Sequence, residues 1–124
     1  MKRFIVILAL LIPFASYAAM SAKELSAVAR DVNKRTPLMV DDDTRLDKVK
    51  AKGNKVLKYQ YTMVNYTGAQ FDKKKFRGSF KDSLTRHTCS KMKKLLNNGV
   101  TIVYHYKAKD GKFLTEVKVN SGNC

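Results

Sequence analysis

The sequence predicts an α+β protein in which helices flank an antiparallel sheet of about four strands, closed by one disulfide. Three observations favour this architecture: two pairs of alternating segments each enclose a glycine-containing turn, an amphipathic region separates the two pairs, and the chain contains two cysteines. Hairpins with one apolar face need a covering layer, which helices on one side of the sheet supply. The expected order of elements is α-β-β-α-α-β-β.

The first 18 residues are typical of a secretory signal peptide. A basic start precedes an apolar run over 4–14, which is too short to span a bilayer, and small residues lead to a cleavage site near Ala18/Ala19. No cysteine lies at this site, so we do not expect a lipoprotein. We expect a periplasmic protein in which residues 19–124 form a single α+β domain.

The protein is strongly basic, with a formal net charge of +15. Cleavage removes Lys2 and Arg3, which leaves 23 basic and 10 acidic residues and a charge of +13. Such a charge favours acidic proteins or an anionic membrane surface as partners. Nucleic acid is not expected as a partner of an exported protein. A solvated basic surface without a partner explains the charge equally well.

Two cysteines in an oxidising compartment indicate a disulfide between Cys89 and Cys124. A metal site would need more ligands at close spacing, and the nearest candidate, His87, has no second pair behind it. Because chain ends otherwise fray, the bond would tie down the C-terminus.

The first predicted helix begins at a capping box formed by Ser21 and Glu24 and ends near Arg35, before Thr36-Pro37. An acidic stretch follows, but it lacks the loop glycine and distal glutamate of a calcium-binding loop. Asp41, Asp43 and Asp47 are therefore interpreted as parts of a polar turn.

The first hairpin is predicted over 44–51 and 55–65, turning at Gly53-Asn54. Tyr59 and Tyr61 fall on its apolar face. Three lysines share a face of the first strand, where edge protection and a binding patch both remain open interpretations. They are Lys48, Lys50 and Lys52.

The longest helix is predicted over 70–87, with Phe76, Phe80 and Leu84 on its buried stripe. A basic row on another face is interpreted either as a dock for an acidic partner or as an ordinary solvated face. It consists of Lys73, Arg77 and Lys81.

Cys89 is predicted to open a shorter helix that ends at 97–99. A second hairpin follows, turning at Asp110-Gly111. Val100, Ile102, Tyr104 and Tyr106 alternate on its first strand, and Phe113, Thr115, Val117 and Val119 alternate on its second.

Catalytic motifs are missing from the sequence. It has no serine in a nucleophile-elbow setting, no glycine-rich phosphate loop and no histidine pair at metal-ligand spacing. His105 is interpreted as a surface residue on a strand. We expect no catalytic residues, no cofactor and no metal, and therefore no enzyme.

The order of elements resembles the α+β pilotins of type II secretion, the AspS-like class. The features that carry the resemblance are the helix closing on a Pro-containing turn, the two hairpins, the helix that leads into Cys89 and the last strand that leads to Cys124. The resemblance implies an antiparallel sheet flanked by helices and a groove that takes a helical segment of a secretin. Pilotins of this class are lipoproteins, whereas this chain lacks the lipidated cysteine.

Three functions follow from these features. The first is a binding or assembly-accessory module for a protein segment of a secretion or envelope complex. The second is a periplasmic inhibitor or immunity protein against a cell-wall enzyme, and the third is a cationic protein of the anionic envelope surface. For the first, a groove lined by tyrosines is the candidate site, because tyrosine pairs a large apolar ring with a polar end. The candidates are Tyr59, Tyr61, Tyr104 and Tyr106, with burial under the helices as the competing interpretation.

Overall fold

The structure, a computed structural model, describes residues 20–72, 74 and 80–124. The predicted signal peptide, Phe76 and two members of the basic row, Lys73 and Arg77, lie outside the described residues. Within the described ranges, no helix combines the length and apolar character that crossing a membrane requires.

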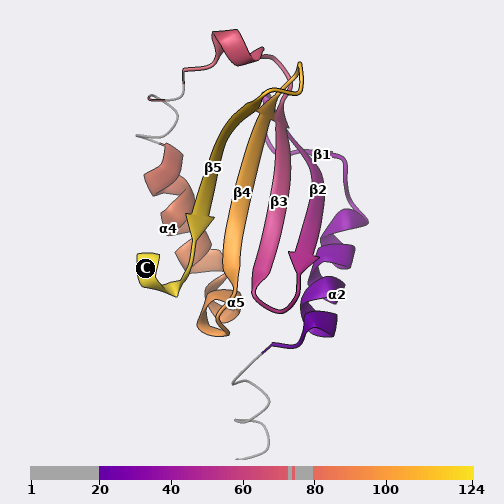
Figure 1. Cartoon of the computed structure of the whole chain (residues 1–124), viewed down its shortest axis with the longest axis vertical. Helices are drawn as coiled ribbons and strands as arrows, with labels where there is room; N and C mark the ends of the chain where they lie inside the picture. Colours follow the sequence, from indigo (N-terminus) through magenta and orange to yellow (C-terminus); the bar gives the residue numbers. More distant parts are fainter. Residues whose placement is uncertain (1–19, 73, 75–79) are drawn as a thin grey trace, which may run out of the picture.

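Five strands form one sheet in the order β1-β2-β3-β4-β5 (Figure 1). They span Leu38–Met39 (β1), Thr44–Lys52 (β2), Val56–Met63 (β3), Thr101–Ala108 (β4) and Phe113–Val119 (β5). The two predicted hairpins, β2–β3 and β4–β5, are confirmed. Gly53 and Gly111 occupy their turns at φ of 58° and 85°, where an L side chain would be strained.

The predicted α+β class, with helices beside a sheet, is confirmed, but the sheet differs from the expected antiparallel sheet of about four strands in two respects. β1 adds a fifth strand beside β2, and it escaped prediction because it is two residues long. β3 and β4 pair in parallel. The chain leaves the end of β3, returns through the helical connection and enters β4 in the same direction as β3, so the two hairpins meet in a βαβ unit.

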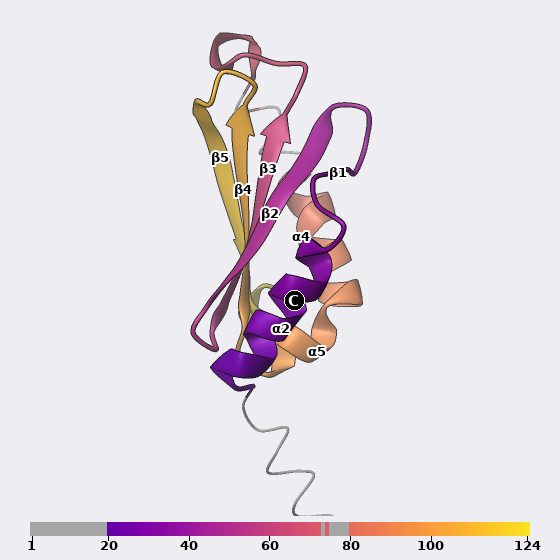
Figure 2. The ribbon, with the colours of Figure 1, turned by 90° about the vertical axis from the view of Figure 1, so that its right-hand side faces the viewer.

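The helices that the structure describes lie on one face of the sheet, and none of them lies on the other (Figure 2). α2 (Ala22–Asn33) lies over β2, and its predicted capping box between Ser21 and Glu24 is confirmed. α4 (Lys81–Lys91) and α5 (Lys93–Asn97) lie toward β4 and β5. One face is therefore covered by the helices, and we call the other the open face.

The helical connection differs from its prediction at both ends. A short 3-10 helix (η1, Gly68–Gln70) stands where the long helix was expected to begin, because the Gln70 side chain turns back to accept from the Thr67 backbone N–H at 2.9 Å. Cys89 lies in the last turn of α4 and does not open a new helix. The break between α4 and α5 falls at Met92, whose φ of −117° and ψ of 25° depart from helical values.

The core lies between the helices and the covered face of the sheet. Its most buried side chains come from α2, β2 to β5 and the segment before β4; they include Leu25, Val49, Leu57, Val100, Ile102, Leu114 and Val119. The predicted alternation of β5 fails at Phe113, which is 54% exposed. An irregular register after Tyr106 pairs Lys107 with Phe113 and sends Leu114 into the core instead.

The outer edge of β2 is protected by the last residue of α2. The Asn33 side chain donates to the Val49 carbonyl at 2.8 Å and accepts from the Val49 N–H at 2.7 Å. It therefore pairs this edge as a neighbouring strand would, in the part of β2 that β1 does not reach. A polar residue at a helix end gave no sequence signal for this role.

Candidate partner-binding face

The four predicted tyrosines form one cluster on the covered face, because β3 and β4 run side by side in register. Tyr59 is paired with Tyr104, and Tyr61 with Tyr106. Ring centroids lie 5.5 Å apart in the first pair and 4.9 Å apart in the second. Tyr59, Tyr104 and Tyr106 are buried, as the competing core interpretation predicted, whereas Tyr61 is only partly buried.

α4 holds this cluster through a buried pair of hydroxyl groups. The Thr88 hydroxyl donates to the Leu84 carbonyl at 2.7 Å, so its oxygen is left to accept from the Tyr104 hydroxyl at 2.6 Å. Phe80 packs edge-on against Tyr106, with ring centroids 5.7 Å apart. The helix therefore fixes the β4 side of the cluster by both a hydrogen bond and an aromatic contact.

Burial sets the ionisation of the four phenols. Loss of hydration raises the pKa of Tyr59 to about 12, with a smaller contribution from Tyr104. Burial likewise raises the pKa of Tyr61, Tyr104 and Tyr106. All four therefore remain neutral in neutral solution and act as hydrogen-bonding and packing groups.

The covered face continues outward to an exposed apolar margin on β1. Cross-strand register aligns Leu38, Leu46, Tyr61 and Tyr106 in one row, which passes from a buried centre to Leu38, 43% exposed. Val40 lies just after β1, where its N–H donates to the Thr44 carbonyl at 2.9 Å; continued strand alternation puts its side chain on the same side as Leu38, and it is 50% exposed. Solvent reaches the apolar side chains of Leu38, Val40 and Tyr61, and we call these three residues the β1 margin.

An acidic turn borders the β1 margin. Asp41, Asp42 and Asp43 follow Val40 directly, in a protein whose charge is otherwise strongly positive. The Asp41 carboxylate contributes to the raised pKa of Tyr106, after burial and the neighbouring Tyr61 and Tyr104. The margin thus combines apolar side chains with a local negative charge.

Sequence reasoning missed Leu38 and Val40. Their signal was the alternation in Leu38-Met39-Val40, which becomes meaningful only once β1 is known to pair with β2. The third residue of the predicted basic row, Lys81, is exposed at the start of α4. The row as a whole cannot be assembled from the described residues.

The predicted disulfide is confirmed. Cys89 and Cys124 are bonded, with their Cα atoms 5.7 Å apart. The bond joins the last turn of α4 to the final residue, after a short 3-10 helix (η3, Ser121–Asn123) that contacts α4 and α5. The C-terminus is therefore part of the helical layer.

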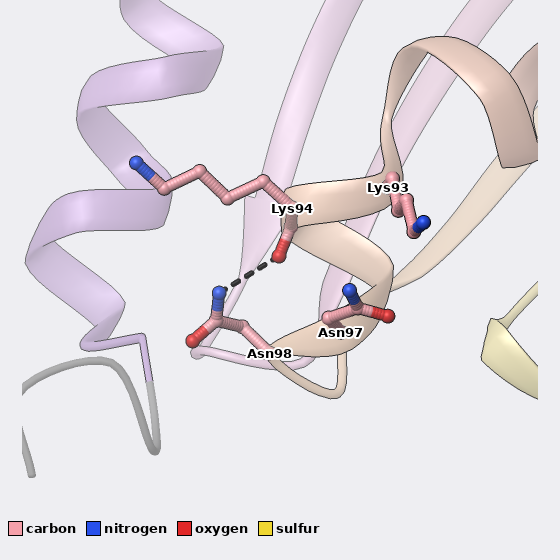
Figure 3. A pocket seen from close by; sticks show the side chains of 4 residues that line it. All are labelled: Lys93, Lys94, Asn97 and Asn98. Carbon is pink, nitrogen blue, oxygen red and sulfur yellow. Dashed lines mark hydrogen bonds between the residues drawn. The ribbon is translucent and has the colours of Figure 1, made fainter. Parts of the chain in front are cut away.

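A concavity of about 550 Å³ lies against α5 (Figure 3). It is formed by Lys93, Lys94, Asn97 and Asn98. The Asn98 amide donates to the Lys94 carbonyl at 2.7 Å, so it is engaged in closing the helix. Across the described part of the chain, no group of three or more potential metal ligands gathers.

Comparison with known proteins identifies the fold. No family model and no curated protein matches the sequence significantly. Matching solved structures include PA3611 from Pseudomonas aeruginosa, with a TM-score of 0.68 and 20% identity over 83% of this chain and 91% of that one.

Two pilotins of type II secretion systems match over similar lengths. EpsS from Vibrio vulnificus gives a TM-score of 0.68 and 10% identity over 83% of this chain and 90% of its own. AspS from Vibrio cholerae gives 0.63 and 12% over 83% and 91%. The chain therefore has a pilotin-like fold, as the resemblance predicted.

Proposed function

We propose that the protein is an exported, non-enzymatic binding protein that assists a secretion or envelope complex by holding a segment of a partner protein. The observation that carries this proposal is the pilotin-like fold, shared with EpsS and AspS over nearly their whole lengths. The signal-like N-terminus and the disulfide support an oxidising compartment such as the periplasm.

The β1 margin is the proposed contact surface. An amphipathic helix binds by laying its apolar face on an apolar surface with polar borders. Leu38 and Val40 supply exposed apolar area, and Tyr61 joins that area to the rigid tyrosine cluster. A bound segment would bury side chains that the folded protein alone leaves in water, which is the main source of affinity in such interfaces.

The acidic turn adds a charge requirement. A segment lying on Leu38 and Val40 would pass Asp41, Asp42 and Asp43, so basic residues on one side of its apolar face would be attracted there. The rest of the protein is basic, so the local negative charge fixes the orientation of the segment. The resemblance to pilotins makes a helical segment of a secretin the first partner to test.

The test measures binding of labelled peptides from the secretin of the same organism to the chain that begins at Ala19, which contains every described helix and strand. Replacing Leu38 and Val40 together by serine should abolish binding of a peptide that the unchanged protein holds. Met39→Ser is the matched control, because Met39 is 48% exposed on the same strand but faces the opposite side of the sheet.

Two results would count against the proposal. If no secretin peptide binds, the partner class is wrong. If a peptide binds equally well to the Leu38/Val40 variant and to the Met39 variant, the β1 margin is not its site. Urea unfolding of each variant should give the free energy of the parent within about 0.5 kcal/mol, because these positions are exposed surface.

A further inference from the structure

The open face of the sheet carries a concentration of positive charge. Among the described residues of its strands, seven basic side chains and two acidic ones occupy this face. The basic ones are Arg45, Lys48, Lys50, Lys52, Lys58, Lys107 and Lys118, and the acidic ones are Asp47 and Glu116. None of α2, α4 and α5 covers them (Figure 2).

Cross-strand register spreads these charges over the whole face. Lys50 and Lys58 are paired in one row that continues through Val103 to Lys118. The next row runs from Lys48 to Glu116. The cations therefore form a broad array, which matches an extended anionic surface better than a single acidic side chain.

The type of cation also indicates the partner. Six of the seven are lysines, which are flexible point charges, and one is an arginine, Arg45, which Asp47 already holds at 2.6 Å. Arginine forks suit fixed, bidentate recognition of a particular carboxylate, whereas lysines attract anions without demanding a register. A lipid headgroup layer offers mobile phosphates at no fixed position, so it suits lysines, which need no fixed register with their anions.

A shallow depression of about 450 Å³ lies within the array, lined by residues of β2 to β5 that include Lys52, Lys58, Lys118 and Glu116. The Glu116 carboxylate lies 4.0 Å from the Lys58 ammonium and 3.9 Å from that of Lys118. It also holds His105 Nδ1 at 2.9 Å. One carboxylate thus gathers two ammonium groups at a hollow wide enough for a phosphate headgroup.

Two exposed apolar side chains stand at the ends of one row of the same face. The row runs from Met39 through Arg45, Thr62 and Lys107 to Phe113. Met39 is 48% and Phe113 is 54% exposed, and the Phe113 ring lies 5.0 Å from His105. Exposed apolar groups beside lysines are suited to the boundary between headgroups and acyl chains.

We propose that the open face binds an anionic phospholipid surface, with its lysines at the headgroups and Met39 and Phe113 inserted at the boundary beneath them. The two contributions complement each other, since peripheral binding strength follows buried apolar area together with attraction to anionic lipid. This proposal does not depend on the partner segment, which would occupy the opposite face.

The first test measures partition of the chain that begins at Ala19 onto vesicles of phosphatidylglycerol and phosphatidylcholine in equal parts. Replacing Lys48, Lys50 and Lys107 by glutamine should weaken partition by about fivefold per lysine, or about a hundredfold together. The matched control replaces three exposed lysines of the helical layer, Lys23, Lys91 and Lys93, and removes the same charge. It should retain most of the affinity.

The second test places a fluorescent reporter on each face. The chain contains no tryptophan. Phe113→Trp should therefore shift its emission to the blue on anionic vesicles and not on phosphatidylcholine alone, whereas Leu38→Trp on the covered face should not shift. High salt should release the protein, because the attraction is screened.

Three outcomes would overturn the proposal: no binding to anionic vesicles, equal loss in the two lysine variants, or a Leu38→Trp shift as large as that of Phe113→Trp. Binding to soluble polyglutamate without binding to vesicles would identify an acidic protein as the ligand and would also overturn it. Because Leu38 and Val40 are not part of this face, failure here leaves the secretin-peptide result unaffected, and the reverse also holds.

Discussion

Replacing Tyr106 and Tyr61 singly by alanine distinguishes a contribution to stability from a contribution to peptide binding on the covered face. Tyr106 is 2% exposed and contacts the rings of Tyr61 and Phe80 at centroid distances of 4.9 and 5.7 Å. Tyr106→Ala should therefore lower the free energy of unfolding by about 4 kcal/mol, the cost of removing a fully buried aromatic ring. Tyr61→Ala should cost about 2 kcal/mol, because part of its ring is already in water.

Urea unfolding followed by circular dichroism gives both values, and peptide binding under folding conditions gives the functional consequence. We expect Tyr61→Ala to weaken a peptide bound at the β1 margin more than its loss of stability explains. Tyr61→Phe is the control, since it keeps the ring and should restore most of the stability. A loss below about 1 kcal/mol for Tyr106→Ala would refute the burial on which the site is built.

Three further predictions concern ionisation, the disulfide and the sheet edge. The pKa of Tyr59 rises from 10.0 to about 12 on folding, so its stabilising contribution is complete below pH 10 and is lost as the pH rises toward 12. Tyrosinate absorbance of the cluster should therefore appear together with unfolding. Titration of the four phenols near pH 10 in the folded protein would contradict this prediction. Replacing Cys89 and Cys124 together by alanine should cost about 4 kcal/mol for a link across 35 residues, and free-thiol labelling of the unreduced parent should find none. Asn33→Ala should cost about 2 kcal/mol, because it leaves the Val49 N–H and carbonyl unpaired. Asn33→Asp should not restore this stability, because it turns a carboxylate oxygen, which cannot donate, toward the Val49 carbonyl. Equal stability of the three proteins would show that the edge needs no such cap.

Local patterns allowed most elements of the fold to be predicted. Ser21 and Glu24 specify the start of α2 within four residues, and Gly53 and Gly111 specify turns whose strands are adjacent in the chain. The tyrosines were placed on one face because strand side chains alternate. Each of these inferences uses residues that are close in sequence, so no knowledge of the tertiary arrangement was needed.

The failures depend on distant contacts. The parallel pairing of β3 with β4 follows from the path of the intervening helices, which a hairpin pattern does not encode. Phe113 points to the open face because the register slips opposite Lys107, and alternation within β5 alone gives the opposite answer. The role of Leu38 and Val40 depends on β1, which exists only through its pairing with β2.

The alternation of Leu38, Met39 and Val40 across β1 makes the two proposed surfaces independent, and this independence is itself testable. The register puts Leu38 on the covered face and Met39 on the open face, and the same alternation returns Val40, just after β1, to the side of Leu38. A peptide on one face and a lipid surface on the other should therefore bind at the same time, and binding of either one should change the affinity for the other by no more than about twofold.

The ternary complex is measured by flotation: labelled peptide should float with anionic vesicles only when the protein is present. The Leu38/Val40 variant should float without peptide, and the Lys48/Lys50/Lys107 variant should bind peptide without floating. Competition between peptide and vesicles would mean that both use one face, which the strand register forbids for side chains placed as they are here.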